Sequence, residues 1–174
     1  MEEYNELPNL KMTALAVLYK NKWNSKKINR SNDFIVKESL SQFASSLEDD
    51  DIGYLYNPLQ PNELCINPGE LVGKISNTNL VYNFNFMNGV KYVISMLKSL
   101  DNSDYNRIGI IVSDCLEKNE VDEMESYLND CEDIKIYKIG IGKCFCSKNM
   151  IYVRDAAELK EILEDIKKNT TISR

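Results

Sequence analysis

The sequence predicts an α/β fold in which a doubly wound, mostly parallel sheet carries helices on both faces. Short apolar segments typical of strands alternate along the chain with longer segments whose apolar residues recur at helical spacing. Some of the short segments are apolar throughout, as expected for strands that are covered on both faces. The 174 residues, of which 43% are hydrophobic, suffice for one domain with a full core.

The first third of the chain predicts a strand, a helix and a second strand. Residues 12–19 (MTALAVLY) are apolar and short, which indicates a central strand. Apolar side chains recur at helical spacing over residues 32–47. The three aspartates at residues 49–51 end this helix, and clustered acids are typical of a solvated surface. Residues 52–56 are expected to form the second strand.

Prolines and polar turns interrupt the next segment. Residues 63–66 follow Pro61 and predict a short edge strand, because proline is tolerated at the edges of sheets. Pro68 can begin a short helix that runs to residue 75. Residues 86–100 have strongly amphipathic spacing, which predicts a longer helix.

The remaining elements alternate again. Residues 108–112 (IGIIV) are the clearest buried strand in the sequence. A helix is expected over residues 119–128, strands over 134–139 and 151–153, and a last helix over 156–167.

These elements predict one domain over residues 12–168, with an N-terminal extension (1–11) and a tail (169–174). The net charge of -6 lacks the basic excess that a phosphate backbone requires, so nucleic acid is not an expected partner. The sequence shows no secretory signal and no apolar run near the roughly 20 residues of a membrane span, so no membrane is expected either. Five dispersed cysteines suit a reducing compartment, which predicts a cytoplasmic or nuclear location.

Few residues offer catalytic or metal chemistry. The chain has no histidine, which removes the commonest general base and the usual nitrogen ligand for zinc. Cys144 and Cys146 are one residue apart, whereas zinc and redox motifs use two, so we expect small apolar side chains here and leave their role open. Gly140 and Gly142 lack the third glycine of a dinucleotide-binding motif and predict a turn. No catalytic residue and no cofactor is expected, and the chain is not predicted to be an enzyme.

A family resemblance emerges when the segments are taken in order. The von Willebrand factor type A domain is resembled over nearly the whole chain, by residues 12–19, 30–31, 37–40, 51–55, 110–114, 136–142 and 155–159 taken together. The resemblance implies a Rossmann-like, doubly wound sheet. It also implies a crest, formed by the loops at the carboxyl ends of the strands, where ligands bind.

In that family the crest holds a divalent cation through Asp-x-Ser-x-Ser, a threonine and an aspartate. Here the first motif falls on Tyr19, Asn21 and Trp23, and the threonine position falls on Phe84. Only Asp114 matches the family's pattern. The resemblance therefore implies that the metal site is degenerate and that no metal ion is bound.

A closer similarity in spacing is to the non-ATPase ubiquitin-receptor subunits of the proteasome regulatory particle. It rests on residues 21–23, 51–55, 70–75 and 84–108. This resemblance implies a scaffold that bridges the lid and base of the 26S proteasome by protein-protein interaction, with the ubiquitin system as a further possible partner. The ubiquitin-interacting helices that follow this domain in the family are not expected after residue 163.

Two alternatives stay open within the type A family. Residues 139–142 and 155–159 resemble the branch that serves metal-chelatase or transport machines. The other alternative is a cation-free type A subunit of the general transcription and repair factor.

The crest after the first strand is basic on an otherwise acidic molecule, and such a patch steers an acidic partner surface. The only tryptophan of the chain lies in this loop, where it can anchor a partner or cover the end of the sheet. The candidates for partner contact are Lys20, Asn21, Lys22, Trp23, Lys26, Phe84 and Asp114.

Overall fold

The computed structural model describes residues 11–21, 30–77, 84–101 and 103–169. Five strands form one sheet in the order β2-β1-β3-β4-β5, and each neighbouring pair is parallel. The strands are β1 (Met12–Lys20), β2 (Ile52–Leu55), β3 (Tyr105–Ser113), β4 (Lys135–Ile141) and β5 (Ile151–Val153). The helices are α1 (Arg30–Ala44), α2 (Pro68–Asn77), α3 (Phe86–Lys98), α4 (Lys118–Leu128) and α5 (Ala156–Asn169). The predicted α/β fold is confirmed.

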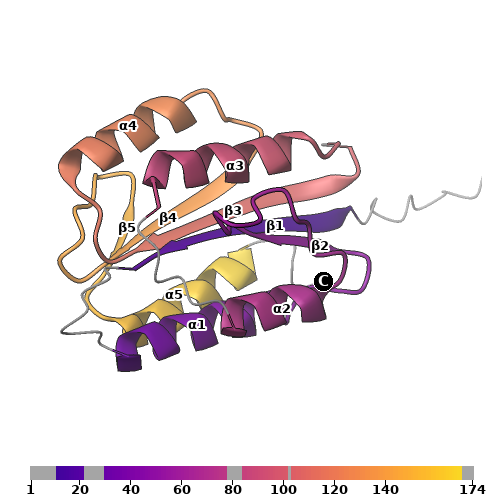
Figure 1. Cartoon of the computed structure of the whole chain (residues 1–174), viewed down its shortest axis with the longest axis horizontal. Helices are drawn as coiled ribbons and strands as arrows, with labels where there is room; N and C mark the ends of the chain where they lie inside the picture. The colour runs from indigo at the N-terminus through magenta and orange to yellow at the C-terminus, as the bar shows by residue number, and fades with distance from the viewer. Residues whose placement is uncertain (1–10, 22–29, 78–83, 102, 170–174) are drawn as a thin grey trace, which may run out of the picture.

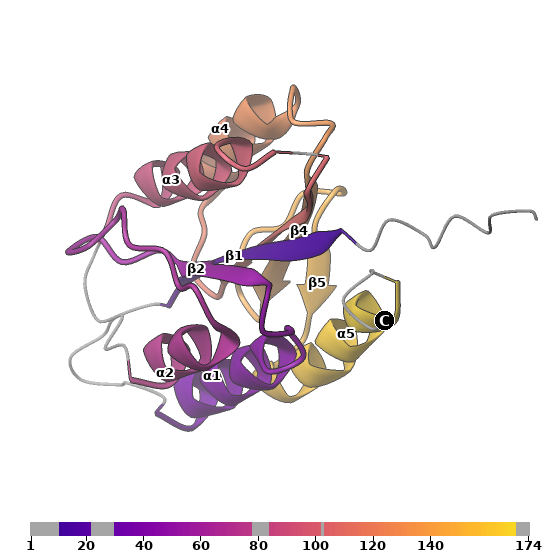
Figure 2. The same ribbon diagram turned by 90° about the vertical axis from the view of Figure 1, so that its right-hand side faces the viewer.

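The sheet lies between two layers of helices, as Figures 1 and 2 show. Helices α1, α2 and α5 cover one face, and α3 and α4 cover the other. Successive residues of β1 alternate between the two cores: Leu15 and Val17 belong to one, Ala16 and Leu18 to the other. This explains why β1 is apolar from Ala14 to Leu18. No helix in the described part of the chain is long and apolar enough to cross a membrane.

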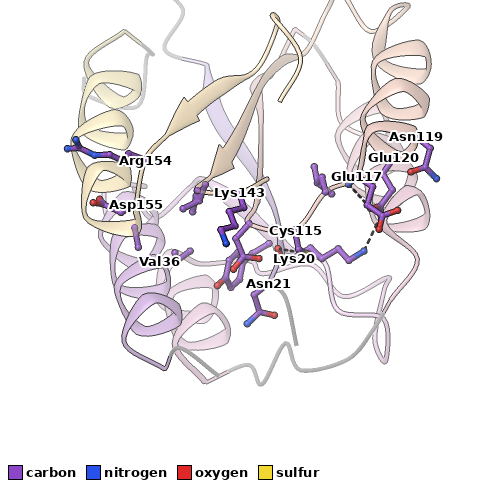
Figure 3. Close-up of a pocket in the computed structure, with 16 residues that line it drawn as sticks. Lys20, Asn21, Val36, Cys115, Glu117, Asn119, Glu120, Lys143, Arg154 and Asp155 are labelled. Carbon is purple, nitrogen blue, oxygen red and sulfur yellow. Dashed lines mark hydrogen bonds and ion pairs between the residues drawn. The ribbon is translucent and has the colours of Figure 1, made fainter. Parts of the chain in front are cut away.

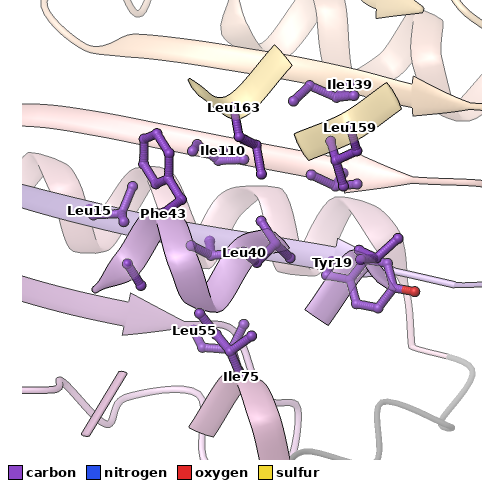
Figure 4. Packing of buried hydrophobic residues seen from close by; sticks show 14 of the residues in the cluster. Leu15, Tyr19, Leu40, Phe43, Leu55, Ile75, Ile110, Ile139, Leu159 and Leu163 are labelled. Carbon is purple, nitrogen blue, oxygen red and sulfur yellow. The ribbon is translucent and has the colours of Figure 1, made fainter. Parts of the chain in front are cut away.

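The core under α1 and α5 reaches to the carboxyl end of the sheet. Figure 4 shows Leu40 and Phe43 of α1 and Leu159 of α5 packing against the strands. Tyr19 lies at the end of this cluster, with its ring buried. The buried ring therefore anchors the carboxyl end of β1, where the crest begins.

Two local predictions are wrong, for identifiable reasons. The edge strand expected over residues 63–66 is reduced to one antiparallel bridge between Gly53 and Cys65. The backbone amide of Glu63 donates to Gln60, and that of Ile66 donates to the Glu70 carboxylate at 3.2 Å, so the chain on either side of the bridge turns away from the sheet.

The second wrong prediction concerns the aspartates at residues 49–51. Asp49 and Asp50 are exposed, but Asp51 is only 3% exposed. Its carboxylate accepts hydrogen bonds from the backbone amides of Thr13 and Glu48, each at 2.7 Å. Asp51 therefore ties the turn before β2 to the start of β1.

The sheet order creates a point at which the chain changes direction. The connection from β1 leads through α1 to β2 on one side, while β3 lies on the other side of β1. The carboxyl ends of the central strands are level, because Lys20 pairs with Ser113 and Ser113 pairs with Gly140. In open α/β sheets, ligands bind in the crevice at such a switch point.

Candidate functional site at the crest

A pocket of about 950 Å³ opens at the carboxyl ends of β1, β3 and β4, at the switch point of the sheet (Figure 3). Its walls come from the end of β1, the loop after β3 and the start of α4, the turn after β4, and the start of α5. The residues that line it are Tyr19, Lys20, Asn21, Val36, Asp114, Cys115, Leu116, Glu117, Asn119, Glu120, Ile141, Gly142, Lys143, Arg154, Asp155 and Ala156.

The end of β1 is joined to α1 by polar contacts that meet at Asp33. The hydroxyl of Tyr19 donates to Oδ1 of Asp33 at 2.9 Å, and the side-chain amide of Asn21 donates to the same oxygen at 3.1 Å. Lys37, one turn further along α1, lies 3.0 Å from Oδ2 of Asp33. Burial, followed by the neighbouring Asp33 carboxylate, raises the pKa of Tyr19, so its hydroxyl stays protonated and donates.

This arrangement does not fit a divalent cation at the positions where the family resemblance would place one. Tyr19 and Asn21 fall on the first cation motif, and both use hydrogen-bond donors toward Asp33. Of these two side chains only the Asn21 oxygen, which is buried and has no hydrogen-bond partner among the described residues, is left for a cation, and one amide oxygen does not make a ligand set. Asp33 in turn has both oxygens engaged, one of them by Lys37. A cation would have to displace these donors before it reached the carboxylate, and the expected Mg²⁺ ligands are hard oxygens with free lone pairs.

Lys20 crosses the other side of the pocket. Its ammonium lies 3.1 Å from Oε2 of Glu120 on α4, and the side chains of both residues are largely buried. The same ammonium lies 6.0 Å from the ring centroids of Phe84 and Phe86. Lys20 therefore ties β1 to α4, and most of its charge is neutralised within the domain.

The loop after β3 brings a thiol to the pocket wall. The Ser113 hydroxyl accepts a hydrogen bond from the Cys115 backbone amide at 3.1 Å, which holds the start of this loop against the end of the strand. Burial is the main cause that raises the pKa of Cys115, and a hydrogen bond with the Ser113 side chain lowers this pKa in part. Because the thiolate is the nucleophilic form, this thiol is poorly activated.

At the starts of α4 and α5, the two helices that begin at the pocket, acidic side chains accept hydrogen bonds from backbone amides. Glu117 and Glu120 form a capping box at the start of α4. At the start of α5, the Asp155 carboxylate accepts from the Glu158 amide at 3.0 Å, and the Glu158 carboxylate accepts from the Arg154 amide at 2.9 Å. These acids occupy the positions at which a helix N-terminus would otherwise hold an anion.

Four charged residues of the pocket lining are exposed: Glu117, Lys143, Arg154 and Asp155. Lys143 follows Gly142, whose φ of 65° lies in the left-handed region and turns the chain sharply after β4. Arg154 follows β5, and like Lys143 it is exposed. These two cations present positive charge at the rim of the crest, while the acids at the helix starts are hydrogen-bonded as described above.

The predicted contact residues have different outcomes. Lys20, Asn21 and Asp114 all line the pocket. Phe84 is buried and packs edge to face on Tyr56, with ring centroids 5.3 Å apart, so it belongs to the core and offers little surface to a partner. Lys22, Trp23 and Lys26 lie outside the described residues.

Sequence reasoning missed four residues that shape the pocket: Asp33, Glu120, Lys143 and Arg154. Asp33 and Glu120 stand in the first turns of their helices, where acids are common for reasons of helix capping alone. Arg154 directly follows the strand predicted over residues 151–153, and Lys143 follows the turn after the strand predicted over residues 134–139. This position, at the carboxyl end of a strand in a doubly wound sheet, was the signal available in the sequence.

Comparison with known proteins supports the fold and extends no further. No protein-family model and no curated protein matches the chain. Among solved structures, the chain is similar to proximal thread matrix protein 1 from the mussel byssus, with a TM-score of 0.60 and 13% sequence identity. The match covers 90% of this chain and 47% of that one, so this chain spans about half the length of its neighbour. The likeness shows the doubly wound, von Willebrand factor A-like or Rossmann-like fold.

Proposed function

We propose that this domain binds other proteins by contact, without turning over a substrate, and that the crest is its contact surface. The observation that carries the proposal is the mutual pairing of polar groups at the switch point. Asp33 is held by Tyr19, Asn21 and Lys37, and Glu120 is held by Lys20. Groups paired in this way shape and stiffen a surface, whereas catalysis requires a base or nucleophile that is free to react.

The exposed charges at the crest suggest the character of the partner surface. Lys143 and Arg154 stand at the rim, on a molecule whose net charge is -6. These cations alternate with the exposed acids Glu117 and Asp155, and fixed charges of this kind orient an approaching surface of complementary charge and disfavour other orientations. We therefore propose a partner that presents carboxylates to this rim.

The assembly we propose first is the 26S proteasome regulatory particle, where the domain would act as a structural subunit between lid and base in the cytoplasm or nucleus. The support is the sequence resemblance across residues 21–23, 51–55, 70–75 and 84–108. A chelatase or transport machine and the general transcription and repair factor are the alternatives that the same experiment distinguishes.

The experiment is affinity purification of the tagged full chain from its own cells, with quantitative mass spectrometry and a sizing gradient. One variant reverses two crest charges, Lys143→Glu with Arg154→Glu. The matched control, Lys91→Glu with Lys98→Glu, changes the net charge by the same amount at exposed positions on α3, away from the crest. Circular dichroism checks that both variants fold.

The proposal expects regulatory-particle subunits to co-purify with the wild type and the α3 variant, and to be reduced at least tenfold with the crest variant. A tenfold loss corresponds to about 1.4 kcal/mol of binding free energy, or about 0.7 kcal/mol for each of the two reversed charges, within the range of about 0.2 to 1 kcal/mol for an exposed ion pair. Recovery of a chelatase or repair-factor complex instead would replace the proteasome assignment. Loss of the complex only with the α3 variant would show that the crest is not the contact surface.

A further inference from the structure

Two thiols meet beside the carboxyl end of β4. Cys144 is buried and Cys146 is half-buried, and the Cys144 thiol donates to the Phe145 carbonyl at 3.4 Å. Both pack on Gly140: a Cβ placed there would lie 2.2 Å from Sγ of Cys146 and 3.4 Å from Sγ of Cys144. Because glycine has no side chain, both sulfur atoms can pack against the backbone at this position.

The segment that carries the thiols is held in place by the surrounding backbone. The Cys144 amide donates to the Ile141 carbonyl at 3.2 Å, and the Phe145 amide donates to the Leu116 carbonyl at 3.0 Å. The hydroxyl of Ser147 then donates to Glu125 on α4 at 2.8 Å. The sulfur atoms are therefore positioned by contacts to two other elements, and a ligand would meet a preformed pair.

The backbone also supplies a donor to sulfur. The Leu116 amide donates to Sγ of Cys144 at 3.3 Å in a buried setting. Burial raises the pKa of Cys144 to about 12, and the Leu116 amide acts against that rise because it favours the thiolate. A hydrogen bond from a neighbouring group to a ligating sulfur is typical of metal sites, where such contacts orient the ligand and adjust its charge.

We propose that Cys144 and Cys146 form a site for a thiophilic monovalent cation, Cu(I), bound between the two sulfur atoms. Thiolates select soft ions such as Cu(I), Zn²⁺ and iron-sulfur clusters. Structural Zn²⁺ and the clusters need four protein ligands. Among the described residues no group of three or more His, Cys, Asp and Glu side chains is placed to hold a metal ion. A pair of sulfurs alone suits the two-coordinate geometry that Cu(I) accepts.

Binding requires both thiols to lose a proton, so the site with its ion carries one negative charge. The Leu116 amide lies against the sulfur that receives this charge, and the half-buried Cys146 provides the path of entry. The site lies behind the pocket wall formed by Leu116, and the proposal is independent of the protein-binding role of the crest.

The test is anaerobic titration of the reduced full chain with Cu(I), delivered in competition with a chromophoric Cu(I) chelator. One ion per chain is expected, with near-ultraviolet absorption from sulfur-to-copper charge transfer. Cys144→Ser and Cys146→Ser should each weaken binding by about 100-fold or more, and Cys131→Ser, at a buried thiol elsewhere in the domain, should change nothing. Zn²⁺ should compete poorly.

Gly140→Ala gives a sharper test because it leaves every thiol in the chain. The new methyl group would displace Sγ of Cys146, and binding should weaken roughly 10- to 100-fold, the range seen when groups that orient ligands are altered. The matched control is Gly109→Ala on β3, where the nearest atom lies at an ordinary 3.5 Å. Equal affinity in Gly140→Ala and Gly109→Ala would overturn the proposal.

A measurement on the wild-type chain tests the site without relying on variants that could fail to fold. Cu(I) should protect Cys144 and Cys146 from alkylation by N-ethylmaleimide, read by mass spectrometry, and leave the rate at Cys131 unchanged. Uniform protection of all thiols, or none, would contradict the site. Loss of binding in Cys115→Ser as large as in Cys146→Ser would contradict the two-sulfur arrangement.

Discussion

Replacement of Asp51 by alanine should be among the most destabilising single changes in the domain. Its carboxylate is 3% exposed and accepts from the amides of Thr13 and Glu48, each at 2.7 Å. Thr13 stands at the start of β1, and Glu48 in the turn after α1. The side chain thus takes the place of backbone partners for one amide at the start of β1 and one in the turn that leads to β2.

The magnitude follows from those two bonds. A hydrogen bond to a charged group contributes about 1.5 to 3 kcal/mol, so Asp51→Ala should lower the free energy of unfolding by about 3 to 6 kcal/mol. That is a large part of the roughly 5 to 15 kcal/mol that holds a typical domain folded. Asp51→Asn keeps one acceptor oxygen but turns a donor toward the other amide, and should cost about half as much.

Urea unfolding at neutral pH measures this cost. The midpoint should fall for Asp51→Ala while the slope of the free energy against urea stays constant. Asp50→Ala is the matched control, because Asp50 is exposed and its removal should change the free energy of unfolding by less than about 0.5 kcal/mol. Equal midpoints for Asp51→Ala and Asp50→Ala would refute the role given to Asp51.

Three further predictions concern packing, pH and the crest. Gly53→Ala would place a Cβ 2.6 Å from Cδ2 of Leu71 and should cost about 1 to 3 kcal/mol in thermal unfolding, whereas Gly73→Ala, which meets nothing within 4 Å, should be neutral or stabilising. The pKa of Tyr19 is raised by burial and by Asp33, so above a pH of about 10 the unfolded chain loses this proton before the folded chain does, and the free energy of unfolding falls as pH rises. Tyr19→Phe should make the free energy of unfolding depend less on pH in this range. An unchanged pH dependence would contradict the role given to Tyr19. Asp114→Asn keeps an acceptor and should cost less than about 1 kcal/mol, while Asp114→Leu should lower the melting temperature clearly; equal melting temperatures in all three proteins would exclude a structural role for Asp114.

Most strands and helices could be predicted from the local pattern of apolar and polar residues. Residues 12–19 and 108–112 are apolar throughout because their strands are covered on both faces, and burial of that kind is recorded in composition. The pattern failed where a strand leaves the core: β3 begins at Tyr105 and includes Asn106, whereas the strand was predicted only over residues 108–112. Pairing of Met12 with Tyr105 and of Thr13 with Asn106 extends the strand beyond its buried part.

Only part of the candidate site could be predicted from the sequence. Asp114 and Asn21 could be placed at the crest, because the carboxyl ends of parallel strands meet at one edge. Asp33 was not found, since nothing near it in sequence distinguishes it from an ordinary acid in the first turn of a helix. Lys143 was not found either, although it follows a predicted strand and its turn. Phe84 was assigned to the surface by its match to a ligand position, but its ring is buried.

By itself, the sequence determined the alternation of strands and helices and the doubly wound class, because hydrophobic periodicity is a property of neighbouring residues. Only the tertiary structure decided which of three successive aspartates is buried, which charge neutralises Lys20, and that two thiols meet beside Gly140. Asp51 and Thr13 are 38 positions apart, and Lys20 and Glu120 are 100 apart. Contacts between such residues depend on strand order and register, which the chain acquires by packing its elements together and which no local pattern records.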